Sequence, residues 1–185
     1  MSSRPAARYH PVSMALHWLL AVALVGMFAV GLYMVDLPFS PQRLQLFNWH
    51  KWAGVLVLTL SFVRLLWRLT HRPPALPAAV EAAMPGWQRL AHQGTHLGLY
   101  ILFFAVPLLG WAYSSASGFP IVLFGVLPLP DFVPVSESLA DLLKPMHQYG
   151  AYAMAALVVL HVAGALKHQF VDRDRLLARM GLGRS

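Results

Sequence analysis

The chain of 185 residues is 58% hydrophobic and only 11% charged, and its mean hydropathy of +0.57 is too high for an ordinary soluble domain. Its net charge of +7 comes from lysines and arginines beside apolar segments, which disfavours nucleic-acid binding and favours a membrane protein. No cysteine is present, which excludes disulfides, thiolate metal sites and cofactors attached through thioether bonds.

Four apolar segments predict transmembrane helices, at about residues 13–35, 50–69, 90–113 and 146–166. Each is close to the ~20 residues that cross the hydrocarbon core as a helix. No small-residue cleavage site follows the first segment, so we expect a retained helix rather than a signal peptide. The predicted fold is all-α, with residues 1–185 forming a single domain built as a four-helix transmembrane bundle.

The basic residues predict the topology. All but three of the fourteen lysines and arginines lie in the two terminal segments or at the connection between the second and third spans. These are Arg4, Arg8, Arg64, Arg68, Arg72, Arg89, Lys167, Arg173, Arg175, Arg179 and Arg184, whereas Arg43, Lys51 and Lys144 lie on the opposite side. Because an excess of basic residues marks the cytoplasmic face, both termini are expected to be cytoplasmic.

The longest predicted connection covers residues 114–145 and contains five prolines. Its apolar stretch "PIVLFGVLPLP" is too short to span and is bounded by proline, so we expect it at the membrane interface. The following "SESLADLLK" predicts a short amphipathic helix capped by Ser136.

Histidines are the unusual feature, because nine occur in so apolar a chain. A lone histidine in a membrane helix often does no more than form a hydrogen bond to a neighbouring helix, but ionisable residues at membrane depth favour a functional role. The predicted topology places His17 and His161 at the cytoplasmic level, and His50 and His147 at the opposite level. His147 and His161 are fourteen residues apart, so they share one helix face about 21 Å apart along the axis.

Two level pairs of imidazoles favour two haem groups. Zinc would need three or four protein ligands, whereas bis-histidine haem takes two, and helical bundles commonly hold such cofactors. His147 can pair only with His50, while His161 pairs with His17 or, as the second choice, with His96. Gly54, Gly150 and Gly164 lie within one turn of the histidines and would leave room for a flat group.

Four stretches carry a family resemblance: "RYHPVSMALHWLLA", "NWHKWAGVLVLTLSFVRLLWRL", "AHQGTHLGLYILFFAVPLLGW" and "LHVAGALKHQFVDRDRLLARM". From about Arg8 to Met180 the chain resembles the bacterial cytochrome b561 family, which is related to the cytochrome b subunits of nickel hydrogenase and formate dehydrogenase. The resemblance implies a multi-pass protein of the bacterial inner membrane with two haem b groups. Their axial ligands would be His17, His50, His147 and His161.

The resemblance also implies electron transfer between the quinone pool and a periplasmic donor or acceptor. At least one relative oxidises superoxide and passes the electrons to ubiquinone, so a superoxide oxidase activity is one of the roles that the resemblance leaves open here. Membrane lipid, quinone and a small periplasmic protein are the expected partners, together with a second copy in a homodimer.

Further candidate contacts lie near the cytoplasmic end. His96 and His168 are predicted to contact quinone, or else haem propionates or water. Arg64 and Arg68 are either topology anchors or propionate contacts, and His10 and His71 are expected to be solvated.

Two alternatives remain open on the sequence. One is a cytochrome b membrane-anchor subunit of a larger dehydrogenase, with the same haems. The other is a metal or proton transporter that uses the histidines, although the scarcity of Asp and Glu within the spans argues against it.

Overall fold

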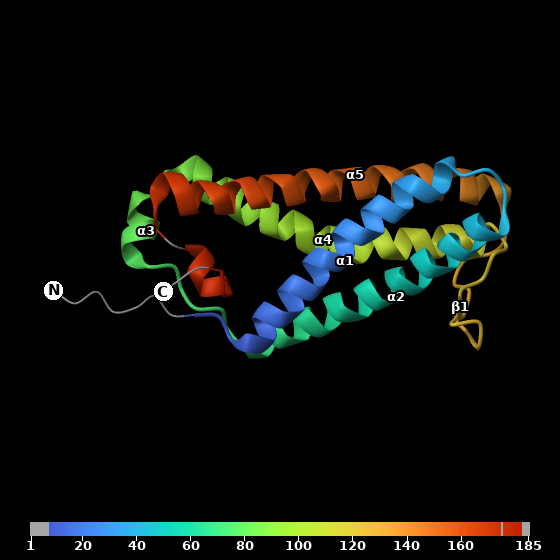
Figure 1. Ribbon diagram of the computed structural model, residues 1–185, viewed down its shortest axis with the longest axis horizontal. Coiled ribbons are helices and arrows are strands. Elements are labelled where there is room, and N and C mark those ends of the chain that lie inside the picture. The colour runs from blue at the N-terminus through green and yellow to red at the C-terminus, as the bar shows by residue number, and fades with distance from the viewer. Residues whose placement is uncertain (1–7, 175, 183–185) are drawn as a thin grey trace.

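A computed structural model describes residues 8–174 and 176–182, which leaves the predicted topology residues Arg4, Arg175 and Arg184 outside the described part. Four long helices form a bundle (Figure 1). They are α1 (Pro11–Asp36), α2 (Pro41–Thr70), α4 (Gly86–Ala116) and α5 (Glu137–Lys167). All four are long and apolar enough to cross a membrane. The predicted all-α, four-helix membrane bundle is confirmed.

The first two long helices begin with a proline that follows a capping side chain. The first helix begins with Pro11 after His10, whose Nδ1 accepts a hydrogen bond from the backbone N–H of Val12 at 3.2 Å. The second begins with Pro41, and the Ser40 side chain accepts from a backbone N–H of the first turn. Proline suits a first turn because the N–H that it lacks has no partner within the helix.

One predicted boundary is wrong. The segment after Ser136 was expected to be a separate short helix, with the loop extending to Pro145. Instead α5 runs without a break from Glu137 through Pro145 into the fourth span. Ser136 does cap the helix, accepting from Leu139 N–H at 3.3 Å. A membrane helix tolerates an internal proline where neighbouring groups satisfy the freed backbone, so Pro145 does not end it.

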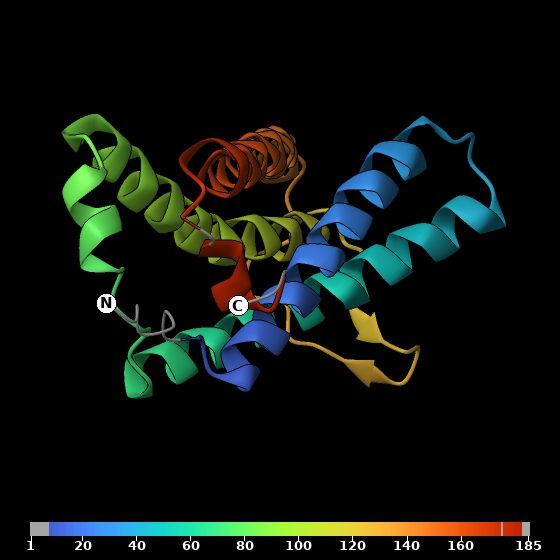
Figure 2. The same ribbon diagram turned by 60° about the vertical axis from the view of Figure 1, so that its left-hand side comes forward.

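Three short helical elements lie at the end of the bundle where α1 begins. The short α3 (Ala78–Ala83) links α2 to α4. After α5, a π-helical turn η1 (His168–Asp172) and a 3₁₀ helix η2 (Leu176–Met180) fold back across this end of the bundle, between α5 and the start of α1 (Figure 2). The indole N–H of Trp18 donates to the Met180 carbonyl at 3.0 Å, which ties this tail to α1.

At the opposite end, the α4–α5 connection forms a two-stranded antiparallel hairpin. Strand β1 (Val122–Leu123) pairs with β2 (Leu127–Pro128), with Leu123 opposite Leu127. In Figure 1 the hairpin projects from the flank of the bundle beside α2.

The middle of the bundle is apolar. Leu20 and Leu24 of α1 and Val57 of α2 are buried together, and Phe103 of α4 and Met154 of α5 pack against them. This layer lies between the levels of the two predicted histidine pairs.

Candidate haem-binding site

His50 of α2 and His147 of α5 lie together at the end of the bundle that is opposite to the start of α1. Their ring centroids are 6.2 Å apart, and the ring planes are nearly perpendicular at 88°. Nδ1 of His147 lies 2.9 Å from the Val106 carbonyl oxygen of α4. A carbonyl only accepts, so Nδ1 carries the proton and the Nε2 lone pair is available to a metal. The buried Nδ1 of His50 has no hydrogen-bond partner among the described residues, so this nitrogen does not bond to a neighbouring helix.

Two glycines on the facing helices make space for this pair. A Cβ at Gly31 of α1 would lie 3.3 Å from Cε1 of His50. A Cβ at Gly110 of α4 would lie 2.9 Å from Cε1 and 3.0 Å from Nδ1 of His147. Both imidazoles therefore pack directly on a helix backbone, where a larger residue would displace them.

The second group lies near the opposite end of the bundle. His17 of α1 and His161 of α5 have ring centroids 6.1 Å apart. His96 of α4 also faces His161, at the shorter centroid distance of 5.0 Å. Its Nδ1 lies 2.7 Å from the His92 carbonyl oxygen one turn earlier. The structure therefore gathers both sequence candidates for the partner of His161.

The spacing within both pairs fits a single metal ion between two imidazoles. With metal–nitrogen bonds of about 2.0–2.1 Å and about 1.1 Å from nitrogen to ring centre, two such rings have centroids about 6.2 Å apart. The observed values are 6.2 Å for His50–His147 and 6.1 Å for His17–His161, whereas His96–His161 is too close at 5.0 Å. Two imidazole donors at each level suit the axial positions of haem iron rather than tetrahedral zinc. The residues therefore fit haem.

The arginine candidates occupy different positions near the inner pair. Nη1 of Arg64 lies 3.5 Å from the Ser13 carbonyl oxygen. Its guanidinium group is also close enough to the rings of His17 and His161 to interact with them electrostatically. Arg68 instead lies over the ring of Tyr100, 5.4 Å from the centroid. Of the two, Arg64 is the one placed to meet an anionic group at this level.

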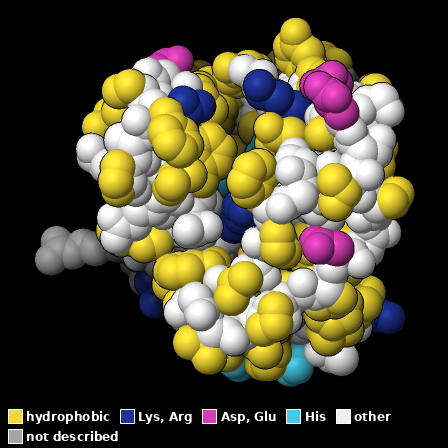
Figure 3. All heavy atoms as spheres, turned by 90° about the vertical axis from the view of Figure 1, so that its right-hand side faces the viewer, with side chains coloured by type: hydrophobic (Ala, Val, Ile, Leu, Met, Phe, Trp, Pro, Cys, Tyr) yellow, Lys and Arg dark blue, Asp and Glu magenta, His cyan; other side chains and the backbone are white. Residues whose placement is uncertain are grey.

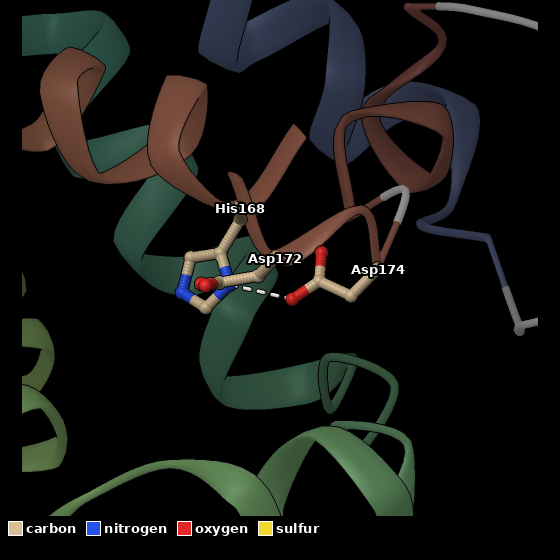
Figure 4. Close-up of side chains that lie close together, drawn as sticks. All are labelled: His168, Asp172 and Asp174. Carbon is tan, nitrogen blue, oxygen red and sulfur yellow. Dashed lines mark hydrogen bonds and ion pairs between the residues drawn. The ribbon is translucent and has the colours of Figure 1, made fainter. Parts of the chain in front are cut away.

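His168 lies at the start of the tail, where it is buried. Figure 4 shows its ring beside Asp172 and Asp174. Its Nδ1 donates to Oδ2 of Asp174 at 2.5 Å, and its Nε2 lies 3.2 Å from Nε2 of Gln88. Lys167 forms an ion pair with Asp172 at 2.7 Å. The "LKHQFVDRD" stretch thus folds the tail around one oriented imidazole.

A cavity of about 570 Å³ opens beside His168, which is within the usual size range for small-molecule sites. Apolar side chains, including Met84 and Trp87, line it together with the polar side chains of Gln88, Lys167 and the two aspartates. His96 is not among the lining residues. The two histidines that were grouped for quinone contact therefore belong to different surroundings.

Three residues of the site were not among the sequence candidates. Gly31 and Gly110 contact histidines on other helices, and Gln88 contacts His168 from α4. The sequence shows only that these residues lie in or beside apolar segments. Glycine is common in membrane helices for packing alone, so its presence did not indicate a site.

Comparison with known proteins agrees with this arrangement. A profile of the prokaryotic cytochrome b561 family matches residues 8–183. Cytochrome b561 homolog 2 of Escherichia coli (strain K12) is 37% identical, over 96% of this chain and 93% of the relative. Cytochrome b561 homolog 1 of the same organism is 31% identical, over 94% and 96%. The probable superoxide oxidase CybB of Yersinia pestis is 29% identical, over 94% and 95%. The chain therefore belongs to the prokaryotic cytochrome b561 family of membrane-bound b-type cytochromes.

Proposed function

We propose that the protein is a di-haem cytochrome of the bacterial inner membrane that transfers electrons between the quinone pool and a donor or acceptor at the opposite face. The observation that carries this proposal is the presence of two imidazole pairs, each with centroids about 6 Å apart, at two levels of one bundle. The name of the Yersinia relative supports superoxide as the donor.

His50 and His147 would hold the haem at one level, and His17 and His161 the haem at the other. When bound, the two groups supply reversible one-electron chemistry. The Val106 carbonyl keeps the Nε2 lone pair of His147 available, and the Gly110 backbone supports the ring. The apolar layer around Leu20, Leu24 and Val57 excludes water between the levels.

The distribution of charge supports cytoplasmic termini. Arg64, Arg72, Arg89 and Lys167 lie at the end of the bundle where α1 begins and η2 ends. The positive-inside rule places that end in the cytoplasm. His17 and His161 then serve the cytoplasmic side, and His50 and His147 the periplasmic side.

The quinone site that the geometry supports best is the cavity beside His168. Asp174 accepts from Nδ1–H, so neutral His168 has a lone pair on Nε2, which the Gln88 amide contacts. When Nε2 is protonated, its N–H would donate to a quinone carbonyl in place of the Gln88 contact. His168 can then carry a proton to or from the carbonyl oxygen, with the Asp174 carboxylate stabilising its charged form. The apolar side chains among the lining residues of the cavity, including Met84 and Trp87, suit the quinone ring.

We assign Arg64 and His96 to contacts with the propionates of the inner haem rather than to the quinone site. Arg64 interacts electrostatically with both imidazoles of the inner pair, and the His96 ring packs against the His161 ring. Arg68, which covers Tyr100, is assigned a place in anchoring the helix end.

The quinone assignment predicts a selective kinetic defect. Replacing His168 with glutamine should slow oxidation of the reduced protein by a ubiquinone analogue about 100- to 10,000-fold, which is the usual range for a lost proton-transfer group. Haem content should remain at two per chain, because His168 belongs to neither imidazole pair. Stopped-flow measurement of haem oxidation tests this.

His71→Gln is the matched control, since His71 is an exposed histidine at the same end of the bundle. It should leave the rate unchanged. If His168→Gln reacts at the parental rate, quinone binds elsewhere. The smaller cavity of about 370 Å³ beside Tyr113, Glu137 and Lys144 would then be the candidate quinone site.

A further inference from the structure

The β1–β2 hairpin carries large apolar side chains that the fold leaves uncovered. The exposed fractions are 76% for Phe124, 82% for Val126 and 57% for Leu127. Residues 118–130 contain no charged side chain. In the end view of Figure 3, hydrophobic side chains are spread over the whole face, including its lower part, where the hairpin lies. A cluster of this kind marks an interaction surface.

The hairpin turn holds a bulky residue in an unfavourable conformation. Phe124 and Gly125 both have positive φ, at 53° and 74°, and Val126 N–H donates to the Leu123 carbonyl at 3.0 Å. This is a type I′ turn, whose first position usually holds Asn, Asp or Gly. A side chain there costs free energy, and the Phe124 ring contacts Trp52 yet remains mostly exposed. The contacts within the chain therefore cover little of the Phe124 ring.

Two hydrogen bonds set the level of the hairpin along the bundle. The indole N–H of Trp52 donates to the Val122 carbonyl at 2.7 Å, and Nζ of Lys51 donates to the Phe119 carbonyl at 2.9 Å. Trp52 lies about 16 Å along α2 from its start at Pro41. The intervening turns contain Gln42, Arg43, Gln45 and Asn48. The hairpin therefore sits at the boundary between this polar part of α2 and its apolar span.

The direction of the hairpin decides which partner it can meet. In both Figure 1 and Figure 2 it projects sideways from the flank of the bundle rather than beyond its end. A sideways surface at this level of a membrane protein faces the bilayer. Trp49, at 51% exposure, and Trp52 lie at the same level, as in the aromatic belts of membrane interfaces.

We propose that the hairpin is a membrane-interface anchor. Phe124, Val126 and Leu127 insert at the boundary between headgroups and acyl chains, in the leaflet opposite to the end where α1 begins. Through Lys51 and Trp52 the anchor also holds the start of the apolar part of α2, next to His50.

The absence of cysteine from the chain allows a direct test with single spin labels. Val126→Cys would be labelled in the full-length protein, in nanodiscs that hold one chain each. Collision of the label with oxygen, which concentrates in lipid, and with a water-soluble nickel chelate would be measured by power-saturation EPR. We expect high oxygen accessibility and nickel accessibility several-fold lower than at an aqueous site.

Two matched labels define the scale. Val22→Cys, at a position 72% exposed on α1, reports the lipid-facing surface. Ser138→Cys, at an exposed position near the start of α5, reports water at the same end as the hairpin. Nickel accessibility at Val126 equal to that at Ser138 would overturn the proposal and indicate a surface for a soluble partner. Protection that appears only in discs holding two chains, with spin–spin broadening, would also overturn it and indicate contact with a second copy.

Discussion

Replacing His147 with alanine should remove one of two haem groups and leave the other, and replacing His50 should remove the same one. The two imidazoles form one pair with centroids 6.2 Å apart and would hold that haem together, so either variant would remove one of its two protein ligands. His161 lies about 21 Å farther along α5 and cannot substitute for His147. His17→Ala and His161→Ala should remove the other haem. Haem stoichiometry and redox titration of the four variants should therefore give two groups of two.

His92→Ala is the control for this series, because His92 is an exposed histidine on α4 that belongs to neither pair. It should keep both haems. The retained haem in each single variant also reports that the bundle has folded. The assignment of the inner pair fails if His17→Ala keeps both haems while His96→Ala loses one.

Gly110→Ala should weaken or abolish binding of the haem held by His50 and His147. The new Cβ would lie 2.9 Å from Cε1 and 3.0 Å from Nδ1 of His147, inside normal contact distance. The ring must move, which disturbs the 2.9 Å hydrogen bond from Nδ1 to the Val106 carbonyl. Overpacking of this kind costs about 1–3 kcal/mol, or roughly 5- to 150-fold in retention of the group. Haem content during detergent washing, followed by redox titration, measures the effect.

Gly94→Ala is the matched control on the same helix, because a Cβ there would meet nothing within 4 Å. It should behave like the parent protein. If Gly110→Ala retains both haems with unchanged potentials, the close contact between α4 and His147 is not part of the site.

The fold class was predictable because hydropathy and length suffice to identify membrane helices. Helix ends were less predictable. Pro145 was expected to end a loop, yet it lies inside α5, since a membrane helix can find other partners for the backbone groups that proline frees. Local sequence does not report those partners.

The histidine levels followed from helical geometry, but the contacts around the rings did not. Gly54 and Gly150 were expected to leave room near the histidines, and in the structure they face Met27 and Val106 instead. The glycines that contact the imidazoles, Gly31 and Gly110, come from the helices opposite. Such contacts depend on how helices rotate against one another, which a single sequence does not specify. For the same reason His96 and His168 could be grouped by depth but not separated into two environments.

The optical spectrum of the purified protein, oxidised and after dithionite, tests the central claim most directly. The account predicts b-type haem bands that sharpen on reduction, with a pyridine haemochrome assay giving two haems per folded chain. A fully folded preparation without haem, or one that binds a single haem per chain, would contradict it.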